Sequence, residues 1–227
     1  MASRSFAVGD IHGCAGHLDA LLARLAPTFE DTIIFLGDYV DRGADAAAVI
    51  SRLLRLRACC RAVFIKGNHD ELMLHAREDD QVRRAWIRYG GDATIASYGG
   101  RFPEGVPQEH WDFLEACVDW HETSDHILVH SPIRADVSIA EQSAEEWRWS
   151  FTIPEARHIS GKWVVCGHCS QHDGLPVVIG GSVLIDTWAH GGQWLTALDL
   201  RTGELTQANA EGQTRSWDWN DVAARAR

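Results

Sequence analysis

Six side chains of metal-ligand type stand just after short apolar stretches of this 227-residue sequence. They are Asp10 and His12 in AVGDIH, Asp38 in IIFLGD, Asn68 in VFIKGNH, His130 in ILVH and His168 in VVCGH. In an α/β sheet, ligands bind beyond the carboxyl ends of the strands, so this placement can gather all six side chains in one cleft. We therefore expect a metal site built from the ends of several strands.

The donor atoms of these six side chains restrict the metal and its chemistry. Carboxylate and amide oxygens mixed with imidazole nitrogens suit divalent ions such as Mn²⁺, Fe²⁺ and Zn²⁺. Six ligands are too many for one catalytic ion that keeps open positions, whereas two ions about 3.5–4 Å apart and bridged by a carboxylate can use them all. Such a pair clamps a phosphoryl group for in-line displacement by a bound water. The sequence therefore predicts two divalent ions and hydrolysis at phosphorus.

Short runs rich in β-branched and aromatic residues predict the strands that carry these side chains. The predicted strands span residues 5–8, 32–36, 62–65, 126–129, 163–165, 182–185 and 195–200. Apolar residues at one-face helical spacing lie at 18–25 and 46–56, and another helix is expected from Pro107 to about Trp120. This alternation of strand and helix predicts an α/β fold, with a mixed sheet in the Gly-rich second half.

The whole chain, residues 1–227, is expected to form one domain. Residues 77–105 carry a mixed-charge run followed by WIRYGGDATIASYGG, and we expect them to form a helical insertion near the site. The polar residues 202–227 are expected to be a C-terminal tail that docks through Trp217 and Trp219.

The composition excludes several classes of protein. The formal net charge of −11 would repel a polyanion, and no Lys/Arg run offsets it, so nucleic acid is not expected as a partner. The apolar runs are far shorter than the ~18–20 residues that cross a bilayer, and the first residues show no secretory signal. The six Cys fit reduced thiols. We therefore expect a cytoplasmic protein without a membrane partner; the sequence does not indicate its oligomeric state.

Four ordered motifs resemble the signature of the phosphoprotein phosphatase family. They are GDIHG (9–13), GDYVDRG (37–43), GNHD (67–70) and VCGH (165–168), and the resemblance extends from about Ser5 to Leu200. The segment WIRYGGDATIASYG is similar to the bacterial and phage branch. The resemblance implies a four-layer α-β-β-α sandwich with two mixed sheets, the calcineurin-like metallophosphoesterase fold. It also implies hydrolysis of phosphoserine and phosphothreonine in a phosphoprotein or phosphopeptide, with Mn²⁺ as the first metal to test.

The family resemblance also implies a role for each candidate residue. One metal would be held by Asp10, His12 and Asp38, and the other by Asp38, Asn68, His130 and His168, so that Asp38 is the bridge. His69 with Asp41 would be the general-acid pair. Arg42 would bind the phosphoryl oxygens, and Arg148 is the best match to a second phosphate-binding Arg, with Arg134 and Arg157 in the same window.

The chain departs from the family pattern beside these residues. The departures are HSPI (130–133), Cys169-Ser170, Trp188, His190 and Asp70. All the implied ligands are retained, so the departures concern the substrate groove more than the reaction type.

Three alternative functions compete with a protein phosphatase. Dinucleoside polyphosphate hydrolases share GDxHGC and GNHD, but their second motif usually departs from GDYVDRG, which this chain keeps. The pair Cys166 and Cys169 resembles a thiol-disulfide redox motif, but Gly174 and Pro176 break the helix that should follow it. A non-catalytic phosphate-binding module should have lost a ligand or the acid, and none is missing. The sequence therefore favours the protein phosphatase, with the dinucleoside polyphosphate hydrolase as the main alternative.

Overall fold

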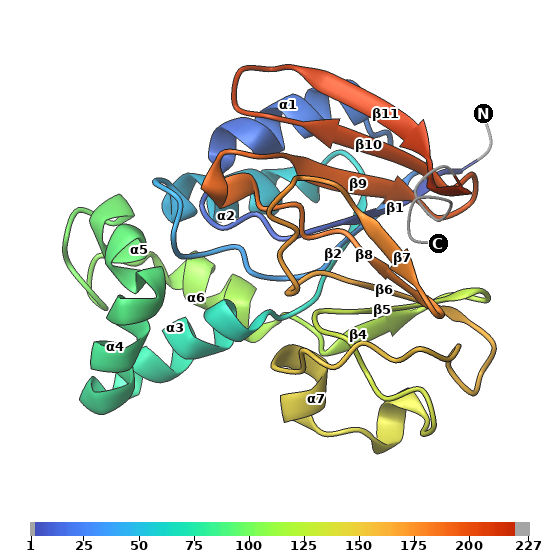
Figure 1. Cartoon of the computed structure of the whole chain (residues 1–227). Coiled ribbons are helices and arrows are strands. Elements are labelled where there is room, and N and C mark those ends of the chain that lie inside the picture. Colours follow the sequence, from blue (N-terminus) through green and yellow to red (C-terminus); the bar gives the residue numbers. More distant parts are fainter. Residues whose placement is uncertain (1–2, 221–227) are drawn as a thin grey trace.

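The computed structural model describes residues 3–220, and it contains two mixed β-sheets packed face to face (Figure 1). In the six-stranded sheet the order is β11-β10-β9-β1-β2-β3, and β1, β2 and β3 are parallel. Its strands are β1 (Ser5–Val8), β2 (Thr32–Phe35), β3 (Arg61–Phe64), β9 (Leu195–Asp199), β10 (Glu204–Ala208) and β11 (Thr214–Asp218).

The second sheet has five strands in the order β4-β5-β6-β8-β7. The central strands β5, β6 and β8 are parallel, and β4 and β7 lie antiparallel at its edges. The strands are β4 (Trp120–Glu122), β5 (His126–Val129), β6 (Trp163–Cys166), β7 (Val177–Ile179) and β8 (Ser182–Leu184).

Alternation along the strands divides the apolar side chains among three cores. In β1, Phe6 and Val8 pack with the helices outside the first sheet, whereas Ala7 faces the second sheet. In β5, Leu128 faces the first sheet and its neighbours Ile127 and Val129 pack on the opposite side. Among the described residues, four helices cover the outer face of the first sheet: α1 (Ala15–Leu25), α2 (Ala46–Leu56), α3 (Asn68–Glu78) and α6 (Gln108–Glu115). Two short helices, η2 (Ile139–Glu141) and α7 (Ala144–Arg148), cover the outer face of the second sheet. The fold is therefore the expected four-layer α-β-β-α sandwich.

Most residues between α3 and α6 are helical, up to Ser97, and turns follow from 98 to 107. The helical residues form α4 (Asp80–Trp86), η1 (Ile87–Gly91) and α5 (Asp92–Ser97), which lie at the left of Figure 1. A short helical turn, η3 (Ala189–Gly191), precedes β9. Within residues 3–220, every helix is too short or too polar to span a bilayer.

The stretch expected to be a polar tail, residues 202–227, instead contributes β10 and β11 to the first sheet, and its residues 221–227 lie outside the described part of the chain. The sequence of β10 is polar although the strand is buried, because its buried polar side chains form hydrogen bonds. The Gln207 amide donates to the Gly174 carbonyl and to Thr196 Oγ1. Trp217 and Trp219 pack against the core between the two sheets, as expected. They do so from the end of the hairpin that β10 and β11 form, not from a tail.

Candidate metal centre and active site

The carboxyl ends of β1, β2, β3, β5 and β6 meet at one edge and bring the six candidate ligands together. Asp38 lies at the centre, with Oδ2 3.3 Å from His12 Nε2 and Oδ1 3.5 Å from His130 Nε2. Asn68 Oδ1 lies 2.9 Å from His130 Nε2 and 3.1 Å from His168 Nδ1. The ligand atoms of Asp10, Asp38 and His130 fall within 4.8 Å of one another. A carboxylate with imidazoles at both of its oxygens has the geometry of a bridging ligand.

Unpaired buried atoms show that this cluster fits a cation. Asp10 Oδ1 and His168 Nε2 are buried and have no hydrogen-bond partner among residues 3–220. Burial, together with the charges of Asp186 and Asp38, raises the pKa of Asp10 well above its usual range. Such crowding of carboxylates is costly without a positive charge beside them. The carboxylates and imidazoles therefore suit divalent metal ions.

The two innermost imidazoles are held in the tautomer that a metal needs. His12 Nδ1 donates to the Val40 carbonyl at 2.9 Å, and His130 Nδ1 donates to the Leu36 carbonyl at 2.8 Å. Because a carbonyl can only accept, Nε2 of each ring is left with a lone pair directed at Asp38. Burial also lowers the pKa of both rings, which keeps them neutral as ligands.

The backbone is strained where it carries the site. Left-handed φ angles occur at His12 (45°), Asp38 (51°), Asp41 (71°), Arg42 (67°) and His168 (60°). Non-glycine residues adopt this region only when the surrounding structure enforces it, and such strain gathers at functional sites. The glycines of the motifs also make room for carboxylates. A Cβ on Gly67 would lie 2.1 Å from Asp38 Oδ1, and one on Gly167 would lie 1.9 Å from Asp10 Oδ1.

His69 and Asp41 form a buried pair beside the metal ligands. His69 Nδ1 lies 2.7 Å from Asp41 Oδ2. Burial lowers the pKa of His69, but the charges of Asp38 and Asp41 outweigh this and leave the pKa raised. The exposed Arg42 lies over the pair and donates to His69 Nε2 at 3.0 Å and to His190 Nε2 at 3.1 Å. His190 is one of the departures from the family pattern, and its contact with Arg42 joins segments far apart in the chain, so the sequence does not show it.

Arg148 does not reach the cleft, contrary to its predicted role in binding phosphate. Its buried guanidinium donates to Glu71 at 3.0 Å and to Asp119. The other two arginines of that window are also engaged elsewhere, Arg134 with Asp136 and Arg157 over the ring of Trp163. Of the four predicted or considered arginines, the structure brings only Arg42 to the metal centre.

A cleft of about 640 Å³ opens over the metal centre, and aromatic side chains form much of its wall. Tyr89 is 60% exposed and Phe151 is 69% exposed. The Phe151 ring lies 4.3 Å from the ring of His168, and Trp149 Nε1 donates to Glu71. Large rings left in water around a reactive centre are typical of a surface that stacks on a ligand.

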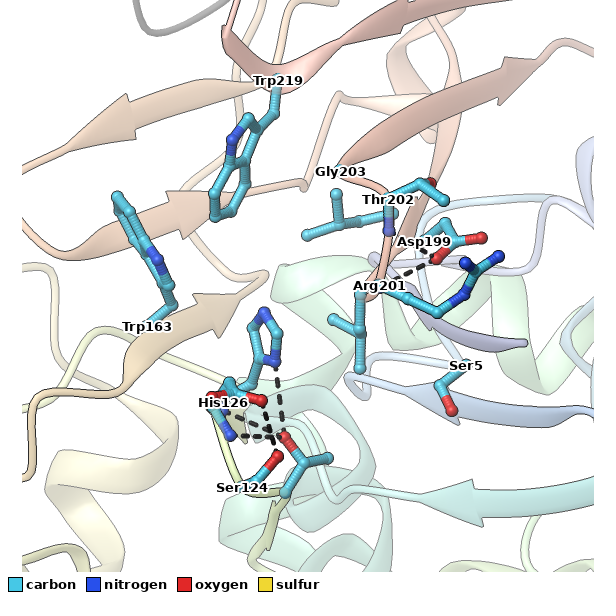
Figure 2. A pocket seen from close by; sticks show the side chains of 13 residues that line it. Ser5, Ser124, His126, Trp163, Asp199, Arg201, Thr202, Gly203 and Trp219 are labelled. Carbon is cyan, nitrogen blue, oxygen red and sulfur yellow. Dashed lines mark hydrogen bonds between the residues drawn. The ribbon is translucent and has the colours of Figure 1, made fainter. Parts of the chain in front are cut away.

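A second pocket of about 540 Å³ lies away from the metal centre (Figure 2). Its walls include Trp163, Trp219 and His126, and none of the predicted site residues lines it. Its polar groups lie at the start of β1 and of β5, at the end of β9 and in the turns beside them, and they share no residue with the cleft over the metal centre.

The thiols of Cys166 and Cys169 do not resemble a redox pair. Burial raises the pKa of Cys166 well above its usual range and that of Cys169 to about 12. A reactive cysteine needs the opposite shift, because the thiolate is the nucleophile.

Several known proteins are similar to this chain. A symmetrical bis(5'-nucleosyl)-tetraphosphatase of Paraburkholderia phymatum is 38% identical over 155 residues, which cover 67% of this chain and 51% of that protein. An asymmetrical bis(5'-nucleosyl)-tetraphosphatase of Oceanobacillus iheyensis is 31% identical over 84% of this chain and 86% of its own length. Serine/threonine-protein phosphatase 1 of Salmonella typhimurium is 38% identical, over 37% of this chain and 38% of its own. The chain thus spans about half the length of the symmetrical tetraphosphatase that it matches.

A solved structure and a family model also match this chain. The crystal structure of a putative diadenosine tetraphosphatase superposes with a TM-score of 0.67 at 19% identity, covering 97% of this chain and 96% of the other. The model of the calcineurin-like phosphoesterases matches residues 4–171. The chain therefore belongs to the calcineurin-like phosphoesterase family, whose members are hydrolases with a binuclear divalent metal centre.

Proposed function

We propose that this hydrolase cleaves the phosphoanhydride chain of dinucleoside polyphosphates. The observation that carries the proposal is the aromatic wall over the metal centre, in particular the exposed rings of Tyr89 and Phe151. A nucleobase stacked on an aromatic side chain contributes about 1–3 kcal/mol. A phosphoserine or phosphothreonine side chain has no ring with which to gain this energy. The tetraphosphatase relatives support the same substrate class, since one of them is matched over most of its length.

Each residue of the site has a role in this reaction. We assign Asp10, His12 and Asp38 to one ion and Asp38, Asn68, His130 and His168 to the other, with Mn²⁺ as the proposed metal. When bound, the two ions would supply an activated water and neutralise charge on the phosphoryl oxygens. In the hydrolysis a water oxygen forms a bond to phosphorus and releases a proton to solvent, while the bond from phosphorus to the bridging oxygen breaks.

The chain's own residues bind the phosphate chain and move the proton. Arg42 is exposed and donates to two neutral imidazole nitrogens, so a charged phosphoryl oxygen offers it a stronger acceptor. When Arg42 turns to that oxygen, His69 Nε2 is free to carry a proton. Asp41 accepts from the opposite nitrogen and stabilises the charged ring. His69 then donates its proton to the leaving phosphate oxygen.

A comparison of substrates tests the proposal. With Mn²⁺ present, kcat/KM is measured for diadenosine tetraphosphate and for peptides carrying phosphoserine, phosphothreonine or phosphotyrosine. We expect kcat/KM to be at least about tenfold higher for the dinucleotide than for the phosphopeptides. One stacked base that contributes about 1.4 kcal/mol is enough to give this factor. Chromatography of the products then shows whether the cut is symmetrical, giving two ADP, or asymmetrical, giving AMP and ATP. A preference for any phosphopeptide would contradict the assignment.

A serine/threonine protein phosphatase is the second candidate, and it is the function that the sequence alone favours. The specific observation for it is the intact GDYVDRG motif, together with the Salmonella typhimurium relative. In the sequence this motif favours the protein phosphatase, but Asp38, Asp41 and Arg42, which it supplies, can act on either substrate. The aromatic wall supports the dinucleotide, because its bases can stack on exposed rings and phosphoserine and phosphothreonine cannot.

A further inference from the structure

The turn that carries Asp41 and Arg42 is held in place by the helical segment 86–94. Both residues have left-handed backbone angles, with φ of 71° and 67°. The Asp41 N–H donates to Thr94 Oγ1 at 2.8 Å, and the Arg42 N–H donates to the Gly90 carbonyl at 3.0 Å. Two residues in a strained conformation therefore depend on contacts from outside their own motif.

The same segment also donates a hydrogen bond to each oxygen of the Asp41 carboxylate. Thr94 Oγ1 donates to Oδ1 at 2.7 Å, and Trp86 Nε1 donates to Oδ2 at 2.7 Å, the oxygen that also faces His69. Trp86 and Thr94 are fully buried. A Cβ on Gly91 would lie 2.4 Å from the Trp86 ring, so glycine at that position lets the indole reach the carboxylate.

These contacts limit a torsion that is otherwise soft. The χ2 angle of an aspartate is broad, so a carboxylate bound only to His69 could rotate and let the imidazole turn with it. A donor on each oxygen fixes the plane of the carboxylate, and the Thr94 hydroxyl fixes the backbone N–H of the same residue as well. The direction of His69 Nε2 is then set through Asp41.

We propose that Trp86 and Thr94 are positioning residues of the general-acid pair, which they serve by fixing Asp41. This inference rests on the proposed role of His69 as the acid. It predicts that removing either donor impairs protonation of the leaving group while the metal ligands remain intact.

Two substrates of similar size test this inference, because they differ mainly in the need for an acid. Phenyl phosphate has a poor leaving group and p-nitrophenyl phosphate a good one. In Thr94→Val, which keeps the volume but loses the hydroxyl, we expect kcat on phenyl phosphate to fall at least about tenfold more than kcat on p-nitrophenyl phosphate. Thr94→Ser should restore most of the difference, and Trp86→Phe should shift it in the same direction as Thr94→Val.

The matched control is Ser97→Ala. Ser97 Oγ donates to the Thr94 carbonyl and accepts from the Ala47 N–H, so it supports the same helix without touching Asp41. We expect it to lower the melting temperature and to leave the ratio between the two substrates unchanged. Equal losses on both substrates in Thr94→Val, with no rescue by Thr94→Ser, would overturn the inference.

His69→Asn separates this inference from the assignment of the acid. If His69→Asn shows the larger loss on phenyl phosphate and Thr94→Val does not, only the positioning role fails. If His69→Asn itself loses equally on both substrates, the acid has been assigned wrongly, and the positioning role fails with it. Metal analysis of every variant confirms that the centre is still loaded.

Discussion

Replacing Phe151 by Leu removes one ring from the aromatic wall and leaves an apolar side chain in its place. Phe151 is 69% exposed, so little of the ring contributes to folding, and the free energy of unfolding should change by about 1 kcal/mol or less. A stacked base is worth about 1–3 kcal/mol, which corresponds to about a 5- to 150-fold loss of kcat/KM on diadenosine tetraphosphate. On phosphoserine, which has no ring, kcat/KM should change by less than about threefold.

The assay for Phe151→Leu is steady-state hydrolysis of both substrates at a fixed Mn²⁺ concentration. Phe29→Leu is the matched control, because Phe29 is 74% exposed but is not among the side chains that line the cleft. The control should behave as the wild type on both substrates. The reasoning fails if Phe151→Leu loses activity equally on the two substrates or loses none on the dinucleotide.

Two further predictions concern ion pairs. Arg148→Met removes the guanidinium that pairs with Glu71 and Asp119, which are themselves partly exposed. The free energy of unfolding should fall by about 1–2 kcal/mol, while KM for p-nitrophenyl phosphate stays unchanged. A raised KM at normal stability would show instead that Arg148 binds phosphate. Asp31→Asn should lower the free energy of unfolding by about 2 kcal/mol at neutral pH, because the hydrogen bond from Arg4 holds the pKa of Asp31 below its ordinary value. This stabilisation is fully present above the unfolded pKa of about 4 and is lost progressively as pH falls toward the lowered folded pKa. In denaturant titrations the difference between variant and wild type should therefore shrink steadily as pH falls below about 4, and a constant difference would contradict it.

The sequence was sufficient to predict how the metal centre is assembled. Each candidate ligand follows an apolar run that forms a strand, and parallel strands end at one edge, so the convergence follows from the pattern. All seven predicted strands are present, as β1, β2, β3, β5, β6, β8 and β9. The glycine in front of Asn68 has a reason that the sequence does not show, since a side chain there would meet the carboxylate of Asp38.

Other features depend on contacts between distant segments, and local patterns do not reveal them. The strands β4 and β7 have three residues each, which is too short for an alternating pattern of apolar and polar residues to be detected in the sequence. The strand β10 has the polar residue Gln207 at a buried position, so its pattern does not indicate a buried strand. The helix expected from Pro107 to about Trp120 ends at Glu115. Arg148 matched a motif by type, but its carboxylate partners come from residues 71 and 119. Trp86 lies in a segment that the sequence singled out, yet its bond to Asp41 appears only in three dimensions.

We propose that Asp38 bridges two metal ions that the hydrolysis requires. One of its oxygens faces His12 and the other faces His130, and an amide in its place bridges two cations far less well than a carboxylate. The most direct measurement is elemental analysis of wild type and Asp38→Asn after loading with Mn²⁺ and removal of the excess, with turnover of p-nitrophenyl phosphate measured on the same samples. We predict about two ions per chain in the wild type, and the loss of both metal and turnover in Asp38→Asn. Two ions per chain with normal turnover in Asp38→Asn would contradict the binuclear account.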